Sequence, residues 1–463
     1  MFSDDTIAAI STPLGEGGIG IVRLSGKDSL RIAEKIFSSP KKRSLKDMES
    51  YRVSYGFAND PSTGEKIDEV LITVMRSPHS YTKEDVVEIN CHGGMIALRK
   101  VLETTLKHGA RLADPGEFTK RAFINGRIDL SRAEAVIDLI RSRTDESRRI
   151  SLEQLQGGLS EKITALRDRL SDICADVEAS IDFPEDEIET IEKHELLESV
   201  KDIGKELQIL LKTYDEGRFF REGLLTAIVG RPNVGKSSLL NALLKKERAI
   251  VTEMPGTTRD VIEEYLNING LPLRIMDTAG IRDVENIAEK EGVKRSLKSI
   301  ENADLVITIF DQSEPLTQED FDVMERIKDK NAIAVLNKSD LLPSFDADTL
   351  VSRLTPHVSR VLAISAIRGD GLEELKDAIF NVCLRDWKEE REGVVVTNIR
   401  HKTSIENALK SLEKAEYALF ENQPVEFLAL ELRDSMDSLG EIVGVVTTED
   451  ILNKIFSDFC IGK

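Results

Sequence analysis

The stretch from Leu224 to Leu240, LLTAIVGRPNVGKSSLL, constrains this chain more than any other. It matches G-x-x-x-x-G-K-[ST] from Gly230 to Ser237, after an apolar run that predicts a strand and before a pattern that predicts a helix. Successive backbone N–H groups in such a loop, together with the helix dipole, bind phosphate. Lys236 can then reach the β- and γ-phosphates, and the Ser237 hydroxyl can ligate Mg²⁺. The alternative is a chance glycine-rich turn, so the rest of the chain must decide.

The other elements of a nucleotide-binding domain follow in order: a TEMPGTTRD loop, a strand ending in Asp277-Thr-Ala-Gly280, then Asn337-Lys-Ser-Asp340, then Ser365-Ala366. A carboxylate at Asp340 can accept hydrogen bonds from guanine N1–H and the 2-amino group, and adenine offers neither, so the nucleotide is GTP. A threonine in the TEMPGTTRD loop can complete the coordination of Mg²⁺ and also contact the γ-phosphate, so that the loop becomes ordered only with the triphosphate. We expect Mg²⁺ on Ser237 and Thr258, and GTP contacts from Asn233, Val234, Gly235, Lys236, Ser237, Ser238, Thr252, Thr257, Thr258, Asp277, Gly280, Asn337, Lys338, Asp340, Ser365 and Ala366.

One position departs from Ras-like GTPases. The residue after Gly280 is Ile281, where those enzymes carry the glutamine that orients the attacking water. An isoleucine cannot do this, so another group places the water or turnover depends on a partner. Spacing alone does not choose among the nearby candidates Arg282, Asp283, Glu285 and Glu289.

The composition excludes several classes of protein. The formal net charge of −20 argues against a general nucleic-acid coat, although a local basic patch stays possible. The N-terminus is acidic and lacks the basic region of a secretory signal, and no apolar run is long enough to span a membrane. Four scattered cysteines without a C-x-x-C pair favour the reducing cytoplasm and argue against structural zinc.

Periodicity predicts a multidomain chain of α/β and all-α parts. Residues 1–125 alternate strand and helix patterns, and residues 126–217 show helical spacing. Residues 218–383 again alternate strands and helices, as in a doubly covered parallel sheet, and residues 384–463 return to helical spacing. We therefore expect a Ras-like P-loop domain inserted into a helical domain. A second glycine motif, from Gly15 to Gly20, matches the dinucleotide fingerprint, but a strand pattern follows it where that fingerprint needs a helix.

Taken together, these motifs make the sequence similar to the tRNA modification GTPase family known as MnmE or TrmE. The likeness covers nearly the whole chain: TPLGEGGIGIVRLSG, EINCHGG, PGEFTKRAFINGRIDLSRAEA, DFPEDEI, the GTPase motifs and a final CIGK. The resemblance implies an N-terminal domain that binds tetrahydrofolate and dimerises, a helical domain, and the inserted G domain. It also implies a homodimer that joins the flavoprotein MnmG (GidA) in a heterotetramer, and addition of a carboxymethylaminomethyl or aminomethyl group to C5 of wobble uridine in tRNA.

The same resemblance assigns cofactors to residues. A 5-formyl- or methylene-tetrahydrofolate would contact Arg23, Glu88, Arg127 and Lys463, and Arg127 stands where family members commonly have lysine. A K⁺ ion near the phosphates, which would stimulate hydrolysis as G domains close across the dimer, would be held by Asn233, Thr252, Met254 and Thr257. Glu289 matches the water-orienting glutamate of the family, so the expected catalytic residues are Glu289, Lys236 and Arg282.

The role of Cys460 and the function of the whole chain remain open at this point. Cys460 is either a residue of the folate site or an inert thiol, and covalent chemistry is the less favoured reading. Cys91 and His92 are adjacent on a predicted strand, so they point to opposite faces and do not form a nucleophile–base pair. A regulatory GTPase of the ribosome-assembly type and a stand-alone folate aminomethyltransferase are the competing functions.

Overall fold

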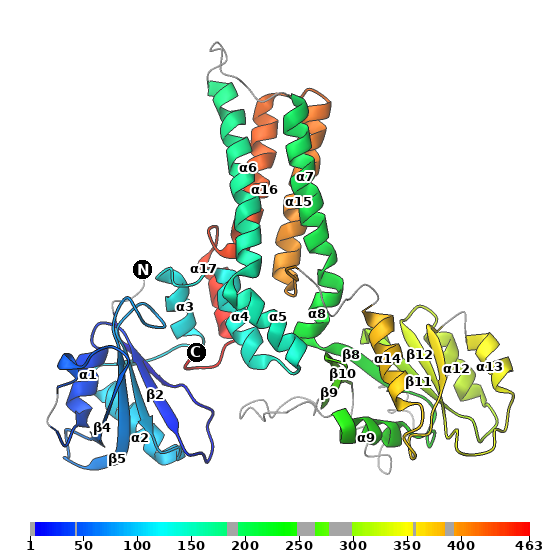
Figure 1. The fold of residues 1–463 in the computed structure, drawn as a ribbon, viewed down its shortest axis with the longest axis horizontal. Helices are drawn as coiled ribbons and strands as arrows, with labels where there is room; N and C mark the ends of the chain where they lie inside the picture. The colour runs from blue at the N-terminus through cyan, green and yellow to red at the C-terminus, as the bar shows by residue number, and fades with distance from the viewer. Residues whose placement is uncertain are drawn as a thin grey trace. The chain divides into compact units, whose positions relative to one another are not determined.

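The computed structural model describes residues 5–41, 44–182, 193–247, 264–276, 299–354, 358–384 and 393–463 (Figure 1). These residues form two compact units. One contains residues up to 137 together with residues 440–463, and the other contains residues between 138 and 439. None of the helices in the described part of the chain combines the length and the apolar character that crossing a membrane requires.

The first unit is built on a seven-stranded sheet in the order β3-β4-β5-β6-β2-β1-β7. Alternate residues of β5 (Val70, Ile72 and Val74) are buried, as expected for a sheet covered on one face. The register of β2 and β6 sets Arg23 opposite Glu88. The elements of this unit are β1 (Ile7–Ile10), β2 (Gly20–Ser25), α1 (Ser29–Ile36), β3 (Phe37–Ser38), η1 (Leu45–Asp47), β4 (Arg52–Asn59), β5 (Lys66–Met75), β6 (Val86–Cys91), α2 (Met95–Lys107), β7 (Arg111–Leu112), α3 (Glu117–Ile124) and α17 (Glu449–Ser457).

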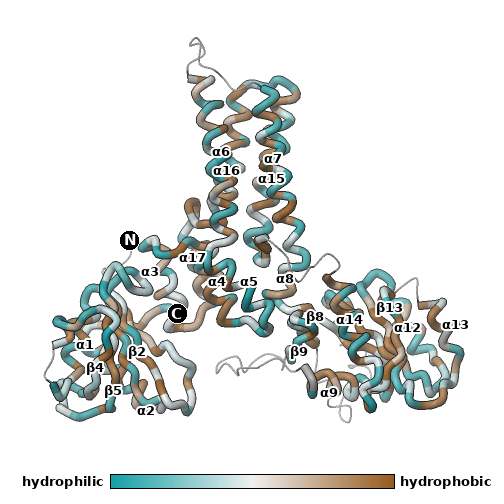
Figure 2. Tube along the Cα trace, in the orientation of Figure 1, coloured by the Kyte–Doolittle hydropathy of each residue, from teal (hydrophilic) through white to brown (hydrophobic). Residues whose placement is uncertain are grey.

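Long amphipathic helices form the next part of the chain, and Figure 2 shows hydrophobic and hydrophilic residues alternating along them. Helix α15 packs along α7, so helices that precede and follow the second sheet in the sequence are neighbours. The helices are α4 (Leu130–Arg141), α5 (Asp145–Gln156), α6 (Gly158–Asp182), α7 (Lys193–Lys212), α8 (Tyr214–Glu222), α15 (Ile399–Phe420) and α16 (Val425–Val443).

The second sheet has six strands in the order β13-β12-β11-β8-β10-β9, and all pair in parallel except β9 with β10. Every residue of β11 and β12 is buried, the pattern of a parallel sheet covered on both faces. The elements are β8 (Leu224–Val229), α9 (Lys236–Glu247), β9 (Glu264–Ile268), β10 (Leu271–Ile275), β11 (Leu305–Asp311), α12 (Gln318–Arg326), β12 (Ala332–Asn337), α13 (Ala347–Leu354), β13 (Arg360–Ala363) and α14 (Leu372–Cys383).

Buried hydrogen bonds hold both places where the chain passes between the helices and this sheet. The Ser147 hydroxyl on α5 donates to the Phe220 carbonyl at 2.7 Å, just before β8 begins. The Gln154 amide, on the same helix, donates to the Val395 carbonyl at 2.8 Å, after the sheet domain has ended. One helix therefore fixes the outgoing and the returning segment, as an inserted domain requires.

The fold class predicted from the sequence is confirmed, and the structure adds details that periodicity did not reveal. Asn269 and Gly270 have φ of 52° and 88°, which forms the turn between β9 and β10. The helical stretch after residue 126 is interrupted at Gly157, whose φ of 110° ends α5 before α6 starts.

Candidate functional site

The phosphate loop between β8 and α9 depends on glycines whose place no side chain can take. Gly235 has a φ of 101°, and a Cβ there would lie 2.2 Å from Nδ2 of Asn337. A Cβ on Gly230 would lie 2.4 Å from the carbonyl oxygen of Ile309. Asn233 adopts a φ of 65° between them, so the loop curls tightly and turns its backbone inward. This geometry fits the anion cradle predicted from the motif.

Lys236 opens helix α9 and folds back over the loop. Its Nζ donates to the carbonyl oxygens of Gly230 and Arg231, each at 2.8 Å. Burial lowers the pKa of this ammonium, and Glu319 opposes that shift. The cation therefore lies against the loop, at the position from which it can reach a phosphate.

The predicted guanine-binding segments meet the phosphate loop through Asn337, which lies at the end of β12. Its Nδ2 donates to the Val234 carbonyl at 2.8 Å, and its Oδ1 accepts from the Ala366 N–H at 3.1 Å. The buried Asn337 amide thus ties three separate segments together. Its role in this structure is to join the loops of the site, because both of its polar atoms are engaged within the protein.

Lys338 and Asp340 follow on the same loop. Lys338 has a φ of 64°, and its Nζ lies 2.5 Å from Oδ2 of the buried Asp311 at the end of β11. The Ser365 hydroxyl is the main cause that lowers the pKa of Asp340, which keeps this carboxylate ionised and able to accept two hydrogen bonds. Asp311 was not identified from the sequence, since a single aspartate after an apolar strand carries no specific signal.

The structure brings together the residues expected from the phosphate loop and from the two base-binding segments. The remaining expected nucleotide and metal ligands and catalytic residues lie outside the described residues: Thr252, Met254, Thr257, Thr258, Asp277, Gly280, Arg282 and Glu289.

A second cluster of expected residues forms in the first unit, on the β2–β6 pair. The Arg23 guanidinium makes a 2.8 Å ion pair with Glu88, and its NH1 lies 3.5 Å from the Gly462 carbonyl oxygen. Arg23 and Arg127 both lie over the ring of Tyr81, at 5.7 and 4.7 Å from its centroid. Three of the four predicted folate contacts therefore meet here from separate segments, with Arg23 and Glu88 65 residues apart in the sequence.

The fourth, Lys463, reaches this cluster because the C-terminal segment pairs with the start of α3. Ile461 forms a bridge with Pro115, and the Phe118 N–H donates to the Lys463 oxygen at 3.2 Å. Gly462 permits this approach, since a Cβ there would lie 2.2 Å from the Ile10 carbonyl oxygen. Burial is the main cause that lowers the pKa of Lys463, and the nearby charge of Arg23 lowers it further. The cluster is therefore a concentrated cationic site with one carboxylate.

The cysteines fall into two environments. Cys91 is buried, and burial raises the pKa of its thiol to about 12. His92 is exposed and pairs with Asp68 at 2.7 Å, so the two neighbours do point to opposite faces. Cys460 is exposed. Tyr81 and Phe118, whose rings underlie Arg23, were not identified from the sequence because isolated aromatics are usually core residues.

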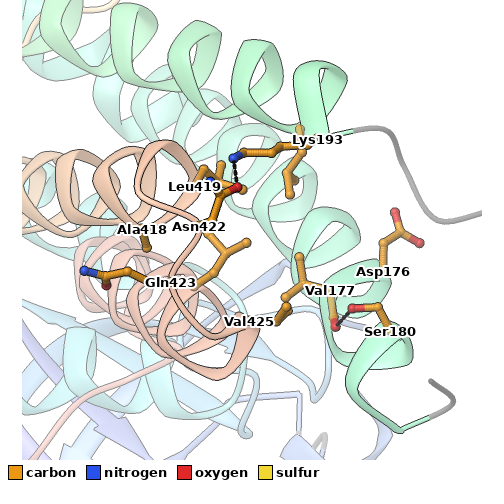
Figure 3. Close-up of a pocket in the computed structure, with 11 residues that line it drawn as sticks. Asp176, Val177, Ser180, Lys193, Ala418, Leu419, Asn422, Gln423 and Val425 are labelled. Carbon is orange, nitrogen blue, oxygen red and sulfur yellow. Dashed lines mark hydrogen bonds between the residues drawn. The ribbon is translucent and has the colours of Figure 1, made fainter.

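A cavity of about 270 Å³ lies elsewhere, between the ends of α6, α7, α15 and α16 (Figure 3). Lys193 points across it and donates to the Asn422 side chain. None of the residues predicted to bind a ligand contributes to it. Its lining residues are Asp176, Val177, Ser180, Lys193, Leu196, Ala418, Leu419, Asn422, Gln423, Val425 and Leu428.

Comparison with known proteins agrees with the likeness seen in the motifs. The family model described as "MnmE helical domain" matches residues 130–460, and "GTP-binding protein TrmE N-terminus" matches residues 6–127. Proteins named tRNA modification GTPase MnmE from Alkaliphilus metalliredigens and Clostridioides difficile are 49% and 48% identical, each over 100% of both chains. Among solved structures, Era in complex with MgGDPNP and a 16S ribosomal RNA fragment is 28% identical over 40% of this chain and 65% of that one, with a TM-score of 0.26. The full-length identity and the family models establish that this chain belongs to the MnmE family.

Proposed function

We propose that this protein hydrolyses GTP within a complex that modifies C5 of the wobble uridine of tRNA. A phosphate loop joined through Asn337 to the candidate guanine-binding segments and a separate cationic cluster occur in one chain, and this combination carries the proposal. A GTPase that only switched would need the first and not the second. The full-length relatives are named as tRNA modification GTPases, which supports the same function.

In the G domain, assigned to residues 218–383, we assign each side chain a role. Lys236 binds the β- and γ-phosphates, and the Asp340 carboxylate selects guanine. Ser237 and Thr258 would hold Mg²⁺, and Asn233, Thr252, Met254 and Thr257 would hold K⁺; both ions supply positive charge to the phosphates. Ile281 cannot orient water, so we assign that function to Glu289, which matches the water-orienting glutamate of the family, and we count Arg282 as a further catalytic residue.

In the N-terminal domain, assigned to residues 1–125, the cluster would bind a 5-formyl- or methylene-tetrahydrofolate. Arg23, Arg127 and Lys463 present positive charge to an anionic group of the folate, and Glu88 presents a carboxylate that can accept hydrogen bonds from it. The folate would supply the one-carbon unit when bound. Residues of this chain hold and orient it, and the nearby Arg23–Glu88 pair keeps both side chains in place at 2.8 Å.

The helical domain, assigned to residues 126–217 and 384–463, would carry the G domain. We further propose a cytoplasmic homodimer that works with the flavoprotein MnmG on tRNA. Closing two G domains across the dimer would complete the catalytic site that Ile281 leaves without a glutamine.

Reconstitution tests the whole proposal. Purified protein, the flavoprotein partner, unmodified tRNA, a folate donor and GTP should yield modified uridine by mass spectrometry of digested tRNA. Omitting GTP or substituting Arg23→Ala should abolish the product. Modification that continues without GTP would contradict the coupling, and a protein that hydrolyses GTP but never modifies tRNA would favour a regulatory GTPase.

Two further measurements test the proposed folate site and the proposed K⁺ site separately. Calorimetric titration with 5-formyltetrahydrofolate should show binding that Arg23→Ala removes, and an absence of binding by the wild type would refute the folate site. GTP hydrolysis should be much faster in K⁺ than in Na⁺ at equal ionic strength. Equal rates would remove Asn233 from the catalytic account.

A further inference from the structure

We propose that Tyr81 is a positioning residue of the candidate folate site, whose ring holds the guanidinium groups of Arg23 and Arg127 together for an anionic folate. The proposal rests on the folate site proposed above. Tyr81 lies in the loop before β6, Arg23 on β2, and Arg127 after α3, so the aromatic ring is the group that these two cations share.

The geometry is that of two cation–π contacts on one ring. The guanidinium carbon of Arg127 lies 4.7 Å from the Tyr81 centroid, and that of Arg23 lies 5.7 Å from it. Arg23 also lies 5.7 Å from the centroid of Phe118, which is fully buried. The negative face of an aromatic ring attracts a cation within about 6 Å. The rings thus offset part of the repulsion between like charges while no anion is bound.

Tyr81 is itself anchored, so it can serve as a reference point. Its hydroxyl lies 2.9 Å from Oγ1 of Thr119, which is fully buried on α3. Its ring packs on the small cluster formed by Ile7, Ala9, Ala113 and Phe118. A side chain held at both its ring and its hydroxyl has few alternative rotamers.

Two hydrogen bonds join the Tyr81 loop to the segment that carries Arg127. The Asn125 amide donates to the Thr82 carbonyl at 2.6 Å, and Lys83 Nζ donates to the Gly126 carbonyl at 2.9 Å. These hydrogen bonds therefore fix the backbone before Arg127 relative to the loop that carries the Tyr81 ring. Tyr81 sets where both guanidinium groups point, although it need not touch the ligand itself.

The test is titration of the full-length protein with 5-formyltetrahydrofolate by calorimetry. Tyr81→Phe keeps the aromatic face and should leave the dissociation constant within about twofold of wild type. Tyr81→Leu removes the face and should weaken binding about tenfold. Replacement by pentafluorophenylalanine keeps the ring's volume while reversing its quadrupole, and should weaken binding as much as leucine does. Tyr55→Leu, on an exposed tyrosine of β4 in the same sheet, is the matched control and should bind as wild type does.

The outcomes separate this role from the function on which it rests. If wild-type protein binds no folate, both fall. If wild type binds and the pentafluoro variant matches it, the ring acts only by packing, and the positioning role is refuted while the folate site stands. If Tyr81→Phe loses as much affinity as Tyr81→Leu, the hydroxyl contact with Thr119 is responsible and the cation–π role is again refuted.

Discussion

The two candidate sites are built in opposite ways. The nucleotide site uses a contiguous loop whose geometry depends on glycine positions, backbone groups and one buried amide, Asn337. The candidate folate site uses side chains from β2, β6, the segment after α3 and the C-terminal segment, brought together by a sheet and a bridge. Backbone sites tolerate almost no added atoms, whereas side-chain sites lose affinity one contact at a time. The predictions below are arranged to test this contrast.

The largest effect is expected for Gly235→Ala. The added Cβ would lie 2.2 Å from Asn337 Nδ2 at a φ of 101°, so the loop and the amide that joins three segments must both move. GTP affinity, measured by titration with a fluorescent GTP analogue, should fall by roughly a hundredfold or more, in line with about 3 kcal/mol of strain and lost contacts.

Gly204→Ala is the control for that substitution. Gly204 lies inside α7, where a Cβ would meet nothing within 4 Å. It should leave GTP affinity unchanged and raise stability by about 0.5–1 kcal/mol, because alanine favours the helix. A Gly235→Ala protein that binds GTP normally would show that the loop rearranges on binding.

Gly462→Ala tests whether the candidate folate site, like the phosphate loop, depends on a glycine that no larger residue can replace. Its Cβ would lie 2.2 Å from the Ile10 carbonyl oxygen at a φ of 94°, which should displace Lys463 from the cluster. Folate affinity should fall about tenfold or more while GTP affinity stays the same. Gly94→Ala, at an open position before α2, should change neither affinity. Loss of GTP binding in Gly462→Ala would contradict the separation of the two sites.

Asp340→Asn tests the base assignment. The amide presents a donor where guanine also presents donors, so affinity for GTP should fall and affinity for XTP should rise, each by about tenfold. Competition of GTP and XTP for the same fluorescent analogue measures the change. An unaltered preference for GTP would show that Asp340 does not contact the base.

The rate of thiol labelling distinguishes exposed Cys460, near the candidate folate site, from the buried cysteines Cys91 and Cys174. Burial raises the pKa of Cys91 to about 12, and burial, with Glu178, raises that of Cys174 to about 11, so few thiolates form at pH 8 and labelling should be slow. Exposed Cys460 should be labelled first, and folate should slow it several-fold while GTP does not. Mass spectrometry of peptides reports each site. Equal labelling of Cys460 with and without folate would place it outside the folate site.

The smallest effect is a pH dependence. Burial and the charge of Arg23 lower the pKa of Lys463, so its ammonium loses its charge as pH rises through a value below that of an exposed lysine. Folate affinity should therefore weaken by a few-fold as pH rises from 7 toward 10. Lys463→Arg stays charged throughout and should remove this part of the dependence. A flat profile for the wild type would mean that Lys463 does not pair with the ligand.

Much of the nucleotide site was predictable because its chemistry is local. The glycines, Lys236 and Ser237 lie within one short motif, and Asn337, Asp340 and Ser365 lie at or just after the apolar runs of β12 and β13. What the sequence did not reveal is that Asn337 joins the loops and that Asp311 pairs with Lys338. Those contacts depend on which strands are neighbours, and β11 lies beside β12 only in the folded sheet.

The candidate folate site was predicted only from resemblance to a family, and the geometry of its residues came entirely from the structure. Arg23 and Glu88 become partners because β2 pairs with β6 in one register, and a shift of one residue would turn them to opposite faces. Tyr81 and Lys463 join them through contacts between segments far apart in the chain. Local patterns in the sequence were therefore enough to indicate the fold class, the phosphate loop and the nucleotide, because each depends on residues that are close together in the chain. The tertiary structure alone decided how distant charges share one aromatic ring, because strand register and chain packing set distances that no local pattern records.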